Sequence, residues 1–166
     1  MRPAPYTRNL SSDQFPKLAR NLSTVENFLS REVAGARILV ADQDPTTSEL
    51  LGSLSGGEGY RIVSVSDGRE AFRVLKTDSN FQVAIFNTTM PHLHGIDIVT
   101  YMKTEKRLMR IPVILVSVEG AIKTVADGFA AGAMALLPKP FSAEQLHRTL
   151  RLALGMAGSL ESRRAA

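Results

Sequence analysis

The stretch that decides the fold is Phe81-Gln82-Val83-Ala84-Ile85-Phe86-Asn87-Thr88-Thr89-Met90-Pro91-His92-Leu93-His94-Gly95. It begins with a short apolar run, Phe81–Phe86, which is typical of a strand covered on both faces. Asn87 ends that run, and the proline and glycine that follow indicate a loop before the next helix. The stretch therefore predicts a central strand with a carboxamide at its carboxyl end.

Similar runs recur on both sides of this strand and alternate with helical patterns, as in a parallel α/β domain. The helices are expected from Asp44-Pro45, over Arg69–Lys76, over Ile96–Lys106, over 120–131 and from Ser142, where Ser142 and Gln145 form a capping box. The predicted strands are Arg37–Ala41, Tyr60–Val65 (an edge strand by its alternation), Phe81–Phe86, Ile111–Val116 and Ala133–Leu137. Five strands in this pattern predict a flavodoxin-like, doubly wound parallel sheet of order 2-1-3-4-5, with its site at the carboxyl ends of the central strands.

The residues from Asn87 to Gly95 resemble the pattern Asp-x-x-Met-Pro-x-x-x-Gly of response regulator receiver domains in everything but the first letter. Each of five positions that follow a predicted strand matches a functional position of that family in order: Asp42, Gln43, Asn87, Ser117 and Lys139. The resemblance covers residues 36 to about 156 and implies a CheY-like fold.

The resemblance implies that Asn87 stands where the family carries its phosphate-accepting aspartate. A carboxamide is a poor nucleophile and a weak ligand for Mg²⁺, which prefers charged oxygen ligands. The family's acidic pair after the first strand reads Asp42-Gln43 here, so the position of the direct metal ligand is also an amide. With two of three carboxylates replaced, we expect a pseudo-receiver that is not phosphorylated in the usual way, and neither a metal ion nor a cofactor.

Ser117 and Lys139 match the hydroxyl and the lysine that bind phosphoryl oxygens in the family. Because few carboxylates oppose Lys139, it is expected to pair with Asp42, and Asn87 and Gln43 are expected to bond loop backbone groups. The family's switch aromatic is replaced by Leu136, which removes the usual rotamer switch. The resemblance also implies a cis Lys139-Pro140 bond. His92 and His94 are interpreted as solvated loop residues, because no third metal ligand is visible at suitable spacing.

Residues 1–35 lie outside the resemblance. A helical arm is expected there for two reasons. Apolar residues recur at helical spacing (Leu18, Leu22, Val25 and Leu29), and Ser23–Glu26 forms a capping box. Two alternatives stay open for this arm: packing on its own domain, or forming a homodimer or holding a partner. The receiver-like domain is assigned to 36–156, and 157–166 to a flexible tail.

Composition places the chain among ordinary globular proteins. Hydrophobic residues make up 44%, there is no cysteine, and no apolar run approaches the length of a membrane span. We therefore expect a cytoplasmic protein without disulfides. The net charge of +4 is mild and the basic residues are spread along the chain, so no specific nucleic-acid contact is indicated.

The leading hypothesis is a non-enzymatic, stand-alone signalling adaptor that acts by protein–protein interaction. Its partner face is expected on the helix over 120–131, the fifth strand and the last helix, with the N-terminal arm contributing. The contacts are expected from the few residues left exposed among Ile122, Val125, Phe129, Leu146, Leu150 and Leu152. The alternative is a receiver still regulated by phosphorylation or another modification at a non-standard residue, such as Ser117 or a deamidated Asn87. A flavin-phosphate site is disfavoured, because no glycine-rich loop follows the first strand and Asp42 and Asp44 would repel phosphate.

Overall fold

A computed structural model of the chain describes residues 35–54, 59–118 and 122–165, with only the backbone for 122 and 156–165. The arm expected over 1–35 lies outside the described residues except for its last residue. No helix in the described part has the length and apolar character that crossing a membrane requires.

Five parallel strands form one sheet of order β2-β1-β3-β4-β5, as the sequence predicted. The strands are β1 (Arg37–Ala41), β2 (Arg61–Val65), β3 (Val83–Asn87), β4 (Val113–Ser117) and β5 (Ala135–Pro138). β3 and β4 are buried at every position, whereas β2 is partly exposed at the edge, in agreement with its alternation. Asn87 is the last residue of β3 rather than the first residue of the loop.

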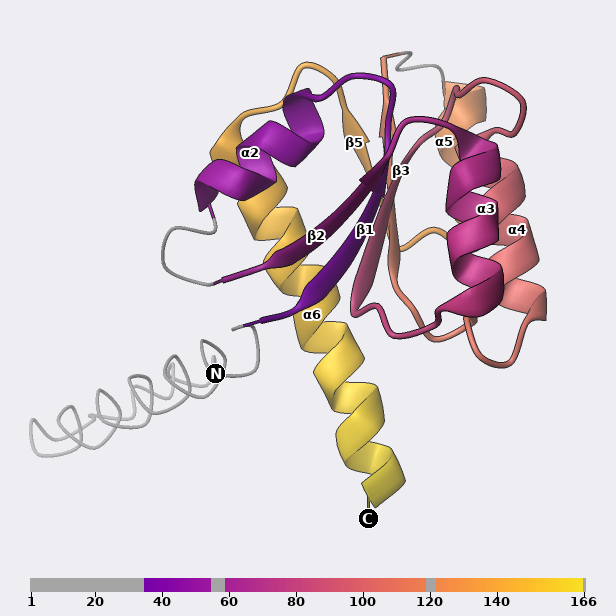
Figure 1. The fold of residues 1–166 in the computed structure, drawn as a ribbon, viewed down its shortest axis with the longest axis vertical. Coiled ribbons are helices and arrows are strands. Elements are labelled where there is room, and N and C mark those ends of the chain that lie inside the picture. The colour runs from indigo at the N-terminus through magenta and orange to yellow at the C-terminus, as the bar shows by residue number, and fades with distance from the viewer. Residues whose placement is uncertain (1–34, 55–58, 119–121, 166) are drawn as a thin grey trace, which may run out of the picture. The chain divides into compact units, whose positions relative to one another are not determined.

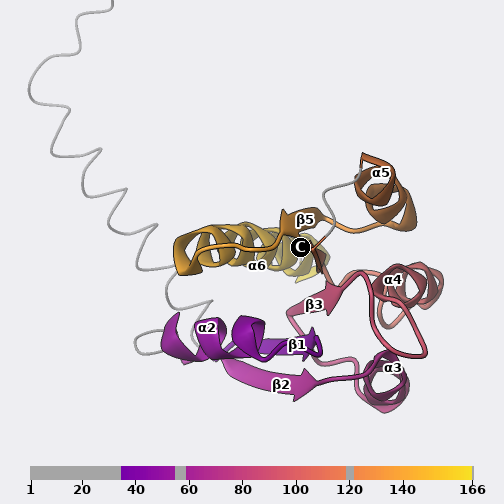
Figure 2. The same ribbon diagram turned by 90° about the horizontal axis from the view of Figure 1, so that it is seen from above.

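Five helices cover the two faces of the sheet (Figures 1 and 2). The helices α2 and α6 lie on one face, and α3, α4 and α5 lie on the other. Their bounds are α2 (Thr46–Leu54), α3 (Gly68–Thr77), α4 (Gly95–Thr104), α5 (Ile122–Ala131) and α6 (Ala143–Ala165). The predicted capping box of α6 is confirmed: Gln145 N–H donates to Ser142 Oγ at 3.1 Å, and Ser142 N–H donates to Gln145 Oε1 at 2.9 Å.

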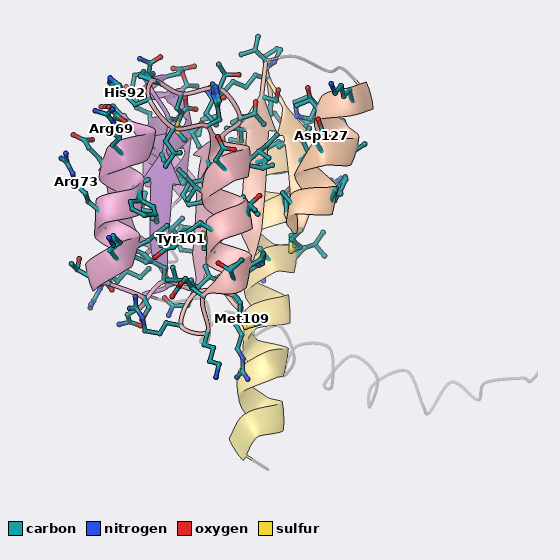
Figure 3. All side chains as sticks on the ribbon, turned by 90° about the vertical axis from the view of Figure 1, so that its right-hand side faces the viewer. Arg69, Arg73, His92, Tyr101, Met109 and Asp127 are labelled. Carbon is teal, nitrogen blue, oxygen red and sulfur yellow. The ribbon has the colours of Figure 1, made fainter. Side chains whose placement is uncertain are left out.

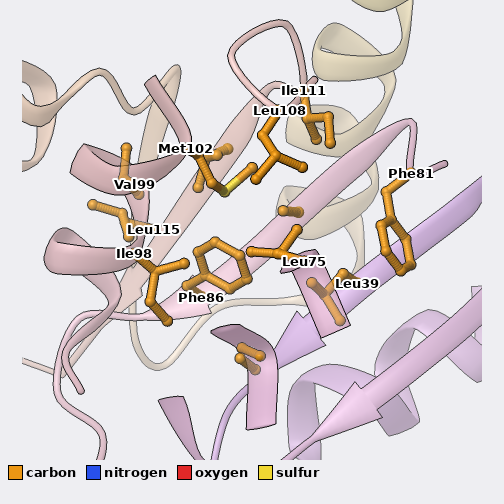
Figure 4. Close-up of a cluster of buried hydrophobic side chains, with 14 of the residues drawn as sticks. Leu39, Leu75, Phe81, Phe86, Ile98, Val99, Met102, Leu108, Ile111 and Leu115 are labelled. Atoms are coloured by element: carbon orange, nitrogen blue, oxygen red, sulfur yellow. The ribbon is translucent and has the colours of Figure 1, made fainter. Parts of the chain in front are cut away.

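The core consists of two apolar clusters, one on each face, because successive side chains of a strand point to opposite faces. Leu39 and Ala41 of β1 belong to the cluster under α3 and α4, which Figure 4 shows around Phe86, Ile98 and Met102. Ile38 and Val40 belong to the cluster under α2 and α6. Both faces of β1 are therefore buried, which explains its nearly continuous apolar sequence.

The last helix is longer than the expected domain. It packs on the sheet through Leu146, Leu150, Ala153 and Leu154, and its backbone continues to Ala165. Residues 157–165, which the sequence analysis assigned to a flexible tail, thus continue α6.

Gly95 begins α4 where that helix passes directly over the end of β3. A Cβ at this position would overlap the carbonyl oxygen of Asn87 and lie 3.2 Å from the Cβ of Phe86. The glycine that closes the Met-Pro-x-x-x-Gly pattern is therefore required by close packing of the backbone on the strand end.

We predict that Gly95→Ala lowers the free energy of unfolding by about 2 kcal/mol or more, because the contact is with backbone that cannot move aside. Gly52→Ala is the control: Gly52 lies within α2 with nothing within 4 Å of the added Cβ, and alanine there should stabilise the protein by about 0.5–1 kcal/mol. Denaturant unfolding followed by circular dichroism measures both. Equal effects of the two substitutions would contradict this account.

Candidate functional site

The carboxyl ends of β1, β3 and β5 bring Asp42, Asn87 and Lys139 together around one buried carboxylate. The side chain of Asp42 is only 1% exposed. Lys139 Nζ donates to Asp42 Oδ2 at 2.6 Å, and Asn87 Nδ2 donates to Asp42 Oδ1 at 2.9 Å. The expected pairing of Lys139 with Asp42 is confirmed.

Two further donors complete the surroundings of Asp42. The hydroxyl of Thr47, a buried residue in the first turn of α2, donates to Oδ2 at 3.1 Å, and the backbone N–H of Asp44 donates to Oδ1 at 3.1 Å. Each carboxylate oxygen therefore accepts two hydrogen bonds. A carboxylate offers about four lone-pair positions, so those of Asp42 are all used.

Sequence reasoning did not identify Thr47, because the family pattern marks only the residues directly after each strand. The first turn of α2 returns over the end of β1, which places Thr47 beside a carboxylate five residues earlier. Asp44 lies in the loop between β1 and α2. Its carboxylate does accept from the N–H and hydroxyl of Thr46, yet it also lies 3.6 Å from Lys139 Nζ. The hydrogen bonds from Thr46, and the Lys139 charge, lower the pKa of Asp44 below its ordinary value.

The two amides behave differently from one another. Asn87 Oδ1 accepts from the N–H of Thr89 at 3.2 Å, so the expectation that Asn87 bonds loop backbone is confirmed. Gln43 is exposed, and within the described part of the chain its side chain makes no hydrogen bond, so its expected bond to loop backbone stays a prediction. Among the described residues, only Asn87 of the two amides bonds to Asp42.

Ser117 ends β4 with 1% of its surface exposed. It contributes to the wall of a pocket of about 310 Å³ beside the cluster, which is lined by Thr88, Thr89, His94, Ile96, Asp97, Ser117 and Thr124. Leu136 stands at the position of the family's switch aromatic. In β5 it is half-buried and packs on the core. The Lys139-Pro140 bond is cis, which confirms the expectation from the resemblance.

The two histidines have separate surroundings. His92 adopts φ 66°, and its Nδ1 lies 2.8 Å from Asp67 Oδ2, whereas His94 lines the pocket. In the described ranges no three His, Cys, Asp or Glu side chains converge as ligands for a metal ion. The contact between His92 and Asp67 was not foreseen, because these residues are 25 positions apart.

Asp67 joins the loop after β3 to the start of α3. Its Oδ1 accepts from the N–H of Arg69 at 2.7 Å, which caps the helix, while its Oδ2 contacts His92. At the same place, a Cβ on Gly68 would overlap the carbonyl oxygen of Leu93. The loop that carries Thr88 and Thr89 is therefore packed closely against the first turn of α3.

The fold is a doubly wound parallel α/β domain with a polar cluster at the carboxyl ends of its strands, and comparison with known proteins places it in a family. The sequence matches the family described as Response regulator receiver domain over residues 38–151, and the chain belongs to this family. It is therefore a receiver domain of a two-component response regulator, a signalling module.

The relatives include both a single receiver and longer regulators. The chain is 28% identical over 120 residues to chemotaxis protein CheY1 of Helicobacter pylori, covering 72% of this chain and 97% of the relative. It is 27% identical to transcriptional regulatory protein TcrA of Mycobacterium tuberculosis, covering 72% and 46%. Among solved structures, Vibrio cholerae CheY4 matches with TM-score 0.64 and 27% identity, covering 73% of this chain and all of that one. The Francisella response regulator 1452 receiver domain has the same TM-score, 26% identity and coverage of 73% and 98%.

We predict that the two partners of the buried ion pair contribute unequally to the free energy of unfolding. Lys139→Met leaves the Asp42 charge buried without its counter-ion and should cost about 3–5 kcal/mol of unfolding free energy. Asp42→Asn leaves Lys139, which is 12% exposed, near Asp44, and should cost about 1–3 kcal/mol. Urea unfolding of both variants measures this difference, and a larger loss for Asp42→Asn would contradict the central role of the carboxylate.

Asp67 provides a pH-dependent prediction. The backbone hydrogen bond from Arg69, and then the bond with His92, lower the pKa of Asp67 below 3.8. Its contribution to stability is therefore fully present above pH 3.8 and is lost as the pH falls through the lower, folded-state pKa. Wild type should exceed Asp67→Asn in unfolding free energy at about pH 6, and the difference should narrow below about pH 4. A difference that is constant down to about pH 2.5 would contradict the charge-based cap.

Proposed function

We propose that this receiver is a pseudo-receiver: it is not phosphorylated in the usual Mg²⁺-dependent way and acts by binding protein partners. The observation that carries the proposal is the saturated carboxylate of Asp42. Magnesium requires a near-octahedral set of oxygen ligands and is usually bound by one or two protein carboxylates. Here the ammonium group of Lys139 lies 2.6 Å from the buried carboxylate of Asp42 and neutralises its charge.

The residues around Asp42 do not fit a magnesium ion. To bind the ion, Asp42 would have to exchange hydrogen bonds with Asn87 or Asp44 for a metal contact, and neither amide of the site supplies compensating charge. Asp44 is committed to Thr46 and is near Lys139. A phosphoryl group would also need a nucleophile at residue 87, which a carboxamide does not provide.

The alternative, modification at a non-standard residue, is opposed by the same geometry. Ser117 is buried at the end of a central strand, where a modifying enzyme has little access. Deamidation of Asn87 needs attack by the backbone nitrogen of Thr88, and that N–H donates to the carbonyl oxygen of Val116 at 2.9 Å. Both routes therefore require local opening of the sheet.

A protein-binding role is supported by the family and by exposed apolar residues on two helices. Of the six residues expected to supply a partner face, Leu146 and Leu150 are fully buried, Val125 is half-buried, and the side chain of Ile122 lies outside the description. Phe129 of α5 is 50% exposed and Leu152 of α6 is 64% exposed. These two are the members of the set that can contact a partner.

Restoring the charges tests the inert site. We expect no saturable Mg²⁺ binding by calorimetry for wild type, and no mass increase after incubation with acetyl phosphate and Mg²⁺. The double variant Gln43→Asp/Asn87→Asp should bind Mg²⁺ and gain one phosphoryl group, because it regains two carboxylates and the nucleophile. Asn87→Ser is the matched control that changes the same position without adding charge.

The single variants sharpen the result. Asn87→Asp alone has the nucleophile but lacks the second carboxylate, and it should be modified at least about tenfold more slowly than the double variant. Phosphorylation of the wild-type chain at more than trace occupancy, or tight Mg²⁺ binding by it, would refute the proposal.

A further inference from the structure

The fold gathers cations that are far apart in the sequence onto one surface. Arg69, Arg73 and Lys76 recur at helical spacing on the exposed side of α3. Lys106, Arg107 and Arg110 follow α4 in the segment that leads to β4, and all three are exposed. The guanidinium of Arg107 donates to the carbonyl oxygen of Lys76 at 3.3 Å, which joins the two groups. We call these six residues the basic surface.

The charges of the basic surface are available to a partner. Within the described part of the chain, none of the six forms an ion pair. Two neighbouring acids have other partners: Asp78 pairs with Arg37 at 2.6 Å, and Glu70 accepts from the backbone N–H of Ser66. Among the residues that the structure describes, the cations of this surface are therefore not held in ion pairs.

An apolar side chain lies in the segment that carries the cations before β4. Met109 is 47% exposed and stands in the sequence Lys106-Arg107-Leu108-Met109-Arg110. Figure 3 shows Arg69 and Arg73 projecting from α3, with Met109 at the opposite end of this side of the molecule. The rings of Phe72 and Tyr101 pack at a tilt of 55°, with centroids 4.7 Å apart, and join α3 to α4.

The backbone of the segment that carries Met109 is anchored to α4. Its carbonyl oxygen, and that of Ile111, accept from Lys103 Nζ at 3.1 and 3.2 Å, and burial of Lys103 lowers the pKa of its ammonium group. The segment that carries Met109 is thus fixed to α4 at two carbonyl groups. An exposed methionine on an anchored backbone, next to arginines in the sequence, is the composition typical of a protein–protein interface.

We propose that the basic surface and Met109 bind an acidic segment of a protein partner that also presents an apolar side chain. The inference rests on the proposed protein-binding function and names the chemistry of the partner. Arginine and methionine are both enriched in protein interfaces, whereas phosphate contacts to nucleic acid would need no apolar anchor. The charge complementarity favours fast association that weakens with salt.

The probe is a fluorescein-labelled peptide of about 18 residues, with leucines at helical spacing and glutamates elsewhere. Anisotropy titration of the full chain should show saturable binding that weakens with added salt. A peptide of the same composition with scrambled order should bind several-fold more weakly. A random-sequence DNA duplex of about 20 base pairs tests the nucleic-acid alternative.

Two matched pairs of variants locate the surface. Arg73→Glu/Arg110→Glu should weaken peptide binding about tenfold or more. The control Arg61→Glu/Lys123→Glu makes the same charge change, outside α3 and the segment before β4, and should stay within about twofold. Met109→Ser should weaken binding more than Val118→Ser, which removes a more exposed apolar side chain outside this surface.

The outcomes separate clearly. Any one of four results would overturn the inference. These are no saturable peptide binding, equal losses of affinity in both charge-reversal pairs, equal binding of the scrambled peptide, and tighter binding of the duplex than of the peptide. None of these results bears on the inert site, which fails only if the wild-type chain takes up Mg²⁺ or a phosphoryl group.

Discussion

The structure depends at its centre on a single buried carboxylate. A charge that is removed from water must be paired and hydrogen-bonded, since otherwise its burial would be very costly. Asp42 meets this requirement with a lysine from the end of β5, an amide from the end of β3, a hydroxyl from α2 and a backbone N–H. Three strand ends and one helix are thereby held around two oxygen atoms.

This arrangement lets the domain keep its fold with a neutral side chain at residue 87. In a site designed to bind a cation, several carboxylates repel one another until the ion is present. Here the protein's own ammonium group supplies the positive charge. Asn87 contributes a donor to Asp42 and an acceptor to Thr89, so one side chain joins the carboxylate to the loop after β3. A carboxylate at the same position could not donate to Asp42, so the amide suits the closed network.

The loop after β3 is held on both sides. Gly95 lets α4 begin against the backbone of Asn87, and Gly68 lets α3 begin against the carbonyl of Leu93. The Asp67 carboxylate joins the helix start to His92, whose left-handed backbone is uncommon for a residue with a Cβ. A loop fixed in this way presents one conformation, which suits a domain that we propose binds partners without a phosphorylation switch.

The sequence by itself determined the α/β architecture, the strand order, the capping box of α6 and the grouping of Asp42, Asn87 and Lys139, because strand periodicity and the ends of parallel strands follow local rules. It did not determine that Thr47 joins the cluster or that residues 157–165 continue α6, since these depend on where neighbouring elements lie. The pairing of Asp67 with His92 and the convergence of the cations on α3 with those before β4 also exist only in the folded chain. Contacts between residues some 25 to 40 positions apart are set by packing of α3 and α4 on one face of the sheet, and no local pattern encodes that proximity.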